Sequence, residues 1–333
     1  MSENPRYNHF FRLNQDTRCF QTAITWATGP CAFSISAYAA KDVPIRQFPS
    51  LHALMIHFST LGITNDFLRA QPQLEELHVD KWNDITDRGL EGLLNLHTLS
   101  IRSNGVISQK TLLNLPSLTS LNVEMNKCAL PLGTHIFQKL KHLSTDAIPY
   151  SALIGPDHIT PKLTRLRLST GELDPDYPLY DTNETLEYLS LGLVTYSTPP
   201  WSKLRRLRKL EISNTDCRSL LKYGHEMTDL VSLSVGGDLC MLNDETLSVF
   251  CHIKELSLSM QNLITDVSIS KLEALEIFSL AGSPHVTHRS IVALKNLKKL
   301  ILSKYDDVLH VCVEEVIKSN GCCSIVKSGQ ILN

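Results

Sequence analysis

Residues 74–101 read LEELHVDKWNDITDRGLEGLLNLHTLSI, and this stretch holds the same apolar triplet twice. The triplet has the spacing i, i+3, i+5, as in Leu74, Leu77 and Val79, and its next copy begins 22 residues later at Leu96. Outward from this stretch the triplet recurs every 21 to 23 residues if Leu140 is accepted as the start of a degenerate member. The other copies begin at Leu51, Leu118, Leu163, Leu186, Leu207, Leu230, Ile253, Leu275 and Leu297. A period this regular predicts about twelve repeated structural units.

Each unit combines two hydrophobic patterns. The last two members of a triplet alternate as in a β-strand, where one side chain points inward and the next points outward. In the clearest units a second apolar set follows at i+11, i+16 and i+19, as in Ile85, Leu90 and Leu93, and these spacings fit a short helix. Directly after the first member of that set comes a residue able to cap a helix start: Thr86, Ser108, Thr265 or Thr287. Each unit is therefore expected to form a strand, a turn and a helix.

Units of this size cannot bury an apolar face alone, so neighbouring units are expected to stack strand beside strand and helix beside helix. The sequence thus predicts one α/β solenoid shaped like a horseshoe, with a parallel sheet on its concave side and short helices on its convex side. Residues 51–304 are expected to form the repeats, residues 1–50 an N-terminal cap with degenerate repeats, and residues 305–333 a C-terminal cap.

The L-x-x-L-x-L wording of these units resembles the leucine-rich repeat family. Residues 85–94 (ITDRGLEGLL) and 263–272 (LITDVSISKL) are similar to the cysteine-containing subtype found in F-box substrate receptors, and Asn104 and Asn126 stand where the family asparagine follows the strand. The resemblance implies a solenoid that binds other proteins, and the subtype implies a substrate receptor or adaptor of a ubiquitin ligase. Neither predicted cap has the leucine- and proline-rich helical pattern of an F-box, so such an adaptor is expected to dock through another segment.

Residues 145–203 depart from the regular units. Seven of the 15 prolines lie between Leu143 and Leu204, where the helical pattern is missing. Proline removes a backbone donor and breaks helices, so the convex side of this segment is expected to be extended or irregular.

The two ends carry degenerate copies of the repeat. Phe33 lies one period before Leu54, and Phe11 lies one period earlier again, so two further strands are expected, with a helix over residues 15–28 between them. At the other end the pattern predicts a helix and then a last strand, at residues 311–318 and 322–327.

Composition and charge narrow the function classes. Lys+Arg number 32 against 34 Asp+Glu, which gives a net charge of -2 and excludes a polycationic nucleic-acid binder or an acidic disordered tail. Nine cysteines are scattered without a C-x-x-C pair, and the polar start lacks the basic-then-apolar order of a secretory signal. We therefore expect a reducing, intracellular location, with the cytoplasm favoured over the nucleus and no membrane insertion.

The sequence contains no nucleotide-binding, zinc-protease or hydrolase motif. His285 and His288 have i, i+3 spacing at a turn without a neighbouring carboxylate or cysteine, so an ordinary surface turn explains them better than a metal site. Cys322 and Cys323 are explained better as a small apolar pair in a terminal strand than as a redox site. We therefore expect no catalytic, cofactor-binding or metal-ligating residues and no enzymatic activity.

What the predicted solenoid offers is a surface. Twelve parallel strands about 4.8 Å apart give a concave face on the order of 55 Å long, which is large enough for a protein partner. After Glu211 the outward strand positions become small, mainly serine, glycine and alanine, which lets a partner backbone approach closely. Before that point they include aromatic, arginine and histidine residues, the types enriched at binding hot spots. The predicted partner-binding residues are His78, Trp82, Arg165, Arg167, Tyr188, Lys209 and Glu211.

The sequence therefore favours a non-enzymatic scaffold that binds a protein partner on its concave face. The alternative is a substrate receptor or adaptor of a ubiquitin ligase. Lesser alternatives are a cysteine-dependent enzyme and an anion or nucleic-acid binder that uses the basic run Lys203–Lys209. The charges of that run are expected to split between two faces and to be neutralised by the acidic loop around residues 172–184, which makes nucleic-acid binding the less favoured of these readings.

Overall fold

The computed structural model describes residues 9–13, 30–36, 49–57, 63–79, 85–101, 107–123, 139–146, 162–173, 185–196, 201, 204–303, 324–327 and 330–332. The chain divides into two compact units, Met1–Leu163 and Thr164–Asn333. The expected caps at 1–50 and 305–333, on either side of the repeats at 51–304, stay a prediction.

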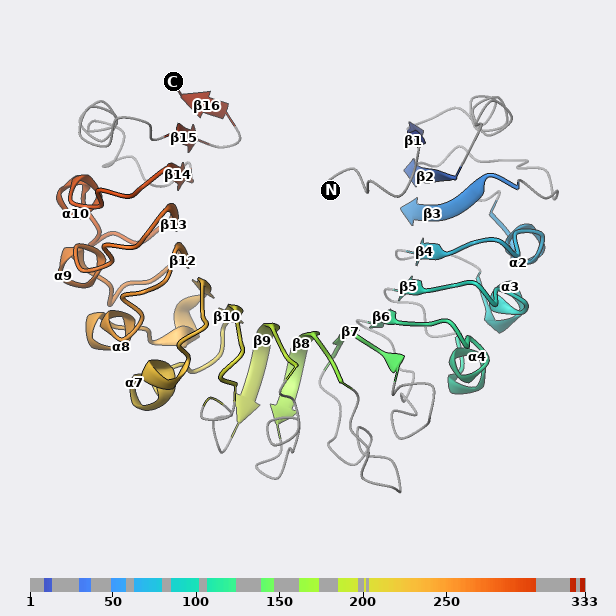
Figure 1. Ribbon diagram of the computed structural model, residues 1–333, viewed down its shortest axis with the longest axis horizontal. Helices are drawn as coiled ribbons and strands as arrows, with labels where there is room; N and C mark the ends of the chain where they lie inside the picture. Colours follow the sequence, from blue (N-terminus) through green and yellow to red (C-terminus); the bar gives the residue numbers. More distant parts are fainter. Residues whose placement is uncertain are drawn as a thin grey trace. The chain divides into compact units, whose positions relative to one another are not determined.

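Unit 1 is built on a parallel sheet whose strands follow one another in chain order. Its strands are β1 (His9–Leu13), β2 (Cys31–Ser36), β3 (Leu51–His57), β4 (Glu76–Val79), β5 (Thr98–Ile101), β6 (Ser120–Val123) and β7 (His142–Thr145). Helices α2 (Asn65–Arg69), α3 (Asp87–Leu90) and α4 (Gln109–Leu113) lie on the other side of the core (Figure 1).

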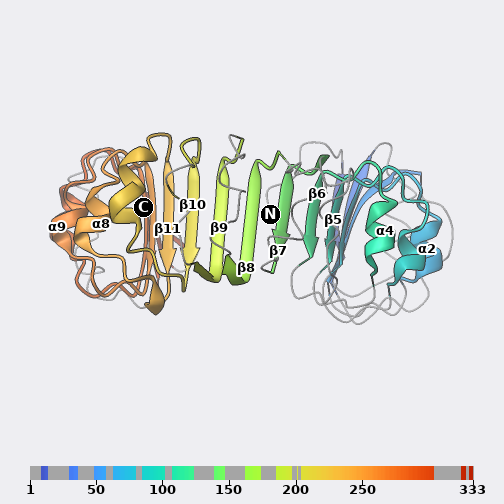
Figure 2. The ribbon, with the colours of Figure 1, turned by 90° about the horizontal axis from the view of Figure 1, so that it is seen from below.

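Unit 2 repeats this arrangement. Its parallel strands are β8 (Arg165–Leu173), β9 (Tyr188–Tyr196), β10 (Lys209–Ser213), β11 (Ser232–Gly236), β12 (Glu255–Ser259), β13 (Ile277–Ala281), β14 (Lys299–Leu302) and β15 (Ser324–Lys327). Opposite the sheet lie α7 (Leu220–Tyr223), η3 (Gly224–Glu226), α8 (Asp244–Ser248), α9 (Asp266–Ile269) and α10 (His288–Val292), and η4 (Asp238–Cys240) follows β11. Figure 2 shows β8 to β11 lying side by side.

The strand register confirms the repeat period. Phe11 pairs with Phe33, and Phe33 pairs with Leu54, so the two degenerate copies at the N-terminal end are in phase with the regular ones. The degenerate member at Leu140 forms strand β7, and its Leu143 is buried beside Leu121. Because every strand presents the same triplet positions to one side, these leucines, isoleucines and valines form a continuous apolar core within each unit.

The helices begin where the sequence predicts, although the predicted capping is only partly right. The hydroxyl oxygens of Thr265 and Thr287 accept hydrogen bonds from the backbone amides two residues ahead, at Val267 and Arg289. Thr86 and Ser108 occupy the same position, but their side chains make no capping hydrogen bond. The predicted helix starts are therefore confirmed at all four positions, and the capping hydrogen bond is formed at Thr265 and Thr287.

The outer turns are joined by a ladder of side chains that the sequence analysis missed. Asp244 accepts hydrogen bonds from the backbone N–H (2.9 Å) and the hydroxyl (2.6 Å) of Thr265 in the next repeat. Asp266 accepts the same pair from Thr287, at 2.7 and 2.5 Å. In unit 1, Asp87 accepts the backbone N–H of Ser108 at 2.6 Å. We call these three aspartates the aspartate ladder; the residue after each helix cap ties its repeat to the next.

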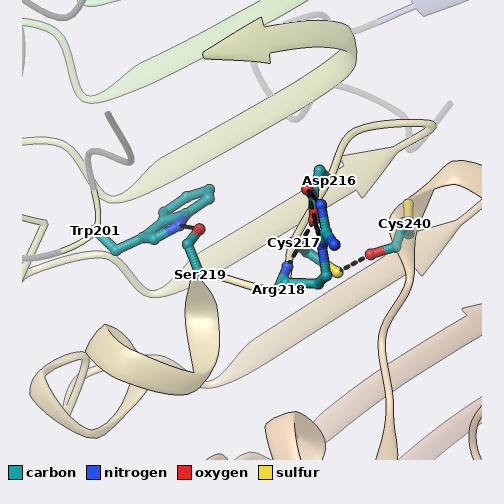
Figure 3. Close-up of polar contacts among 6 residues, drawn as sticks. All are labelled: Trp201, Asp216, Cys217, Arg218, Ser219 and Cys240. Carbon is teal, nitrogen blue, oxygen red and sulfur yellow. Dashed lines mark hydrogen bonds and ion pairs between the residues drawn. The ribbon is translucent and has the colours of Figure 1, made fainter. Parts of the chain in front are cut away.

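The proline-rich segment agrees with the expected irregularity where the structure describes it. Strands β8 and β9 are nine residues long, against four or five in β10 to β14. Within residues 162–173, 185–196 and 204–208 no residue is helical. Trp201 is fully buried, and its indole N–H donates to Ser219 Oγ at 2.8 Å (Figure 3). Extended strands and one large aromatic side chain therefore cover the core here.

The ends are described only in part. The helices predicted at 15–28 and 311–318 lie outside the described residues. The predicted last strand at 322–327 is confirmed as β15, and the sequence did not predict the antiparallel strand β16 (Gln330–Leu332) that pairs with it. Of the helices that the structure describes, none combines the length and the apolar composition needed to cross a bilayer.

Candidate binding surface

Five of the seven predicted partner-binding residues lie together on the sheet of unit 2. Arg165 and Arg167 are on β8, Tyr188 is on β9, and Lys209 and Glu211 are on β10. His78 lies in unit 1, half-buried on β4 between Met55 of β3 and Ser100 of β5. Trp82 lies outside the described residues.

The repeat register brings the five residues into two rows. Arg165 is paired with Tyr188, which is paired in turn with Lys209. Arg167, Ser190 and Glu211 form the next row along the same strands. The rows face away from the core because the strand residues between them, such as Leu166, Leu189 and Leu210, are buried. We call Arg165, Arg167, Tyr188, Lys209 and Glu211 the inner-face cluster.

The cluster is held by contacts between adjacent repeats. The Tyr188 hydroxyl donates a hydrogen bond to Glu211 Oε2 at 2.6 Å, and Lys209 Nζ lies 3.0 Å from Glu211 Oε1. The Arg165 guanidinium carbon is 5.9 Å from the centroid of the Tyr188 ring, and Lys209 Nζ is 5.6 Å from the same centroid. Both distances are within the range of a cation–π contact. The aromatic ring is thus fixed in position by groups on both neighbouring strands.

The electrostatics of the cluster stabilise the neutral phenol and the charged carboxylate. Burial raises the pKa of Tyr188 to about 12, and the hydrogen bond to Glu211 and the negative charge of Glu211 add to that effect. Burial also raises the pKa of Glu211, but the hydrogen bonds from Tyr188 and Lys209 and the charges of Lys209 and Arg167 outweigh it, so this pKa is lowered. Neither group titrates near neutral pH, where a general acid or base would need to exchange protons.

The two rows of the cluster continue differently on the strands beyond it. Ser234 of β11, Ser257 of β12 and Ser279 of β13 follow in the row of Arg167 and Glu211, and all three are partly exposed. The row of Tyr188 passes through Ser232 of β11 and then meets the larger Glu255 and Ile277. A fixed aromatic and cationic cluster therefore borders one row of small side chains, along which a partner backbone can approach closely.

The basic run Lys203–Lys209 divides between surfaces as the sequence analysis expected. Lys209 belongs to the inner-face cluster, whereas Arg205 lies 3.8 Å from Glu226. Arg206 and Arg208 are exposed at the edge where the strands begin. Lys203 and most of the acidic loop expected to neutralise the run lie outside the described residues; the partners observed are Glu226 and Glu211.

Of the three free thiols that the structure describes, Cys251 is exposed, whereas Cys217 and Cys240 are buried. Cys217 donates its S–H to the backbone carbonyl of Cys240 (Figure 3), and Cys240 donates its S–H to the backbone carbonyl of Gly236. Burial raises the pKa of Cys217 to about 12 and also raises that of Cys240, so neither is a thiolate at neutral pH. Cys322 and Cys323 lie outside the described residues.

The described residues bring together no group of three metal-ligating side chains. His285 is exposed and His288 begins helix α10, next to the aspartate ladder. In the sequence, only the i, i+3 spacing of these two histidines suggested a metal site.

The comparisons with known proteins give the fold. No family model and no curated protein sequence matches the chain. A chain in the structure of the Rad7 and Elc1 complex in yeast is similar with a TM-score of 0.57 and 19% identity, over 82% of this chain and 82% of that one. A chain in the Toll–Spätzle complex of Drosophila is similar with a TM-score of 0.50 and 15% identity, over 96% of this chain and 50% of that one.

These likenesses agree with the stacked strand–helix units, with the buried triplet positions and with the predicted fold class. The finer subtype assignment, drawn from residues 85–94 and 263–272, is not settled by them. The chain has the leucine-rich repeat fold, and in each of its two units a parallel sheet is backed by short helices.

Proposed function

We propose that the chain is a non-enzymatic scaffold that binds a protein partner on the face of the sheet opposite to the helices. The inner-face cluster in unit 2 is the proposed centre of that contact. The observation that carries the proposal is the fixed Tyr188 ring, held between Arg165 and Lys209 and bonded to Glu211, with the small outward residues of strand β11 next to Lys209 and Glu211. Tyrosine and arginine give large contact area or bidentate hydrogen bonds at low entropic cost when they are already ordered.

The charges of the cluster indicate the chemistry of the partner. Arg165, Arg167 and Lys209 are cationic, and Glu211 is the single carboxylate among the five residues. Arg165 and Arg167 are exposed, so their guanidinium groups can meet carboxylates of a partner. We therefore propose a partner surface that is acidic where it covers β8 to β10. His78 in unit 1 and Trp82 also stay predicted partner contacts, but they are not part of the inner-face cluster.

The proposal has support at the level of fold. The titles of the two similar structures name complexes, of Rad7 with Elc1 and of Toll with Spätzle. A fold does not fix a function, so these complexes indicate what such a surface can do and not which partner this chain has. The buried free thiols Cys217 and Cys240 support a reducing, intracellular location, which is part of the same proposal.

A charge-reversal experiment tests the proposed face. The variant Arg165→Glu with Arg167→Glu changes two exposed side chains, and the matched control Lys271→Glu with Lys295→Glu makes the same charge change beside α9 and α10. After affinity purification from the native cell, quantitative mass spectrometry should show proteins that the wild type and the control retain and the inner-face variant loses. Retention of every partner by the inner-face variant would show that binding occurs elsewhere.

A narrower form of the proposal is a substrate receptor or adaptor of a ubiquitin ligase. It is favoured by the wording of residues 85–94 and 263–272, which resembles the subtype found in F-box substrate receptors. Cullin-complex subunits should then be among the proteins retained by both the wild type and the control Lys271→Glu with Lys295→Glu, which we call the outer-face control. Their absence from all purifications would remove this form and leave the general proposal standing.

A further inference from the structure

A groove lies in unit 2 at the edge of the sheet where strands β8 to β11 begin, and it shares no lining residue with the neighbouring inner-face cluster. Its volume is about 800 Å³, within the range of ligand sites in proteins. The lining includes Glu187, Arg206, Arg208 and Asp229, which are all exposed, together with Thr185 and Thr228.

The repeat places these charged residues on neighbouring units. Arg206 and Arg208 flank Leu207, which is fully buried, so the two arginines face away from the core at the start of β10. Glu187 occupies the position of Arg208 in the preceding unit, and its carbonyl accepts the Arg208 amide at 2.9 Å. Asp229 occupies the position of Arg206 in the following unit. A central pair of cations is therefore bordered by one carboxylate on each side.

The same edge of unit 2 provides an internal comparison. Lys254, Glu276 and Lys298 occupy the position of Arg208 in later units, and they neutralise one another, with Glu276 oxygens 3.3 Å from Lys254 Nζ and 2.6 Å from Lys298 Nζ. In the groove the charges alternate in a similar way, yet within the described part of the chain Arg206 and Arg208 form no ion pair with either carboxylate. All four side chains are exposed and line the groove, so a ligand in the groove can reach them.

The charge pattern selects the class of ligand. A purely anionic ligand would be attracted by the two arginines and repelled by both carboxylates. A purely cationic ligand would be attracted by the carboxylates and repelled by the arginines. Guanidinium groups bind carboxylates in a bidentate manner, and Glu187 and Asp229 can accept hydrogen bonds from lysine or arginine. We propose that this groove binds a peptide segment of mixed charge, in which acidic side chains reach Arg206 and Arg208 and neighbouring basic side chains reach Glu187 and Asp229. This site is separate from the inner-face cluster and does not depend on it.

Three labelled peptides test the proposal with the full chain: ten residues of alternating lysine and glutamate, ten glutamates, and ten lysines. Fluorescence anisotropy at low salt should give a Kd for the alternating peptide at least tenfold lower than for either homopolymer. Because exposed ion pairs are screened by salt, that binding should weaken strongly at high ionic strength. Equal binding of all three peptides, or no binding of the alternating peptide up to about 1 mM, would overturn the proposal.

Charge variants assign any binding to the groove. Arg206→Glu with Arg208→Glu should weaken binding of the alternating peptide at least tenfold, whereas the outer-face control Lys271→Glu with Lys295→Glu should leave it unchanged. Glu187→Lys with Asp229→Lys should reverse the preference and favour the ten glutamates. Unchanged preference in both groove variants would place the binding elsewhere. The inner-face variant Arg165→Glu with Arg167→Glu should still bind the alternating peptide, so failure here and failure of the proposed function can be told apart.

Discussion

Two regions of unit 2 differ in strand length and in the polar contacts that join adjacent repeats. Strands β8 and β9 are nine residues long and belong to the proline-rich part of the sequence, whereas β11 to β13 are short and are backed by α8 to α10. In the second region the polar contacts between repeats lie on the outer side, where Asp244 and Asp266 bind the next helix cap. In the first region Tyr188 binds Glu211 on the inner side, and away from that face Trp201 binds Ser219 and the Val194 amide binds Thr215.

The difference teaches where this chain can place a binding surface. A carboxylate such as Asp266 accepts several hydrogen bonds from the next repeat of its own chain. Its oxygens therefore join two repeats and are not offered to a partner. The inner-face cluster satisfies Glu211 in the same way but leaves Arg165 and Arg167 exposed. We infer that structural and binding roles are divided between the two sides of the sheet.

The largest expected effect is a loss of stability on removing a buried aromatic side chain from either region, which tests whether the two regions are equally well packed. Trp201 in the first region and Phe250 in the second are both fully buried. Replacing either with alanine should lower the free energy of unfolding by about 3–5 kcal/mol, because a large cavity is left behind. Urea denaturation of both variants measures this. A loss below about 1 kcal/mol for Trp201→Ala alone would show that the proline-rich region does not depend on its buried tryptophan.

The next effect concerns the aspartate ladder. Asp266→Ala should cost about 2 kcal/mol, because the change removes the acceptor for the Thr287 amide and hydroxyl and for the Ser290 hydroxyl. Glu273→Ala, an exposed carboxylate next to α9, is the matched control and should change stability by less than about 0.5 kcal/mol. Equal urea midpoints for the two variants would show that the ladder does not stabilise the outer side.

The same ladder predicts a dependence of stability on pH. Burial raises the pKa values of Asp244 and Asp266, but hydrogen bonds from the next repeat outweigh it, so both are lowered in the folded chain. A lowered pKa means that the stabilisation is complete above the unfolded value, about 3.9, and is lost as the pH falls through the folded values. The urea midpoint should be level from pH 7 to about 5 and fall below about pH 4.

A ladder variant checks that assignment. Asp244→Asn with Asp266→Asn should be less stable than the wild type at pH 7 and should show a shallower loss of stability in acid, because two of the titrating groups are gone. An acid limb as steep as that of the wild type would assign the pH dependence to other carboxylates.

The smallest expected effect on stability lies in the inner-face cluster. Glu211→Gln should cost less than about 1 kcal/mol, since the side chain is part-exposed, with 30% of its surface accessible. Its spectroscopic effect should be larger: the pKa of Tyr188, about 12 in the wild type, should fall toward its ordinary value, because the negative charge next to the phenol is removed. Burial keeps it somewhat raised.

NMR of ring-labelled tyrosine between pH 9 and pH 11 is the measurement, and Lys209→Met is the control. That control keeps Glu211 and therefore should not lower the Tyr188 pKa. A Tyr188 resonance that titrates identically in the wild type and in Glu211→Gln would contradict the cluster geometry.

Much of the fold follows from the spacing of a few residue types. Leu163, Leu186 and Leu207 mark the start of each unit, and the register of Arg165 with Tyr188 and Lys209 follows once parallel strands are assumed. Patterning was less informative where β9 continues beyond its unit: Leu193 is 53% exposed while Val194 is buried, so the simple alternation ends there. At that point Gly192 passes so close to the Ser169 carbonyl that a Cβ atom would lie 2.1 Å from the carbonyl oxygen.

By itself the sequence determined the period, the buried triplet positions and the outward face of the residues between them, because side chains alternate within each regular strand. It did not determine the faces of Leu193 and Val194 in β9, where the alternation ends. The tertiary structure decided which charged groups neutralise one another and which stay available. Glu211 meets Tyr188 from the preceding unit, whereas Arg206 and Asp229 share a groove without pairing. The reason is physical: residues 21 to 24 positions apart become neighbours only after the repeats stack, and the rotamers that packing then permits decide which of them touch.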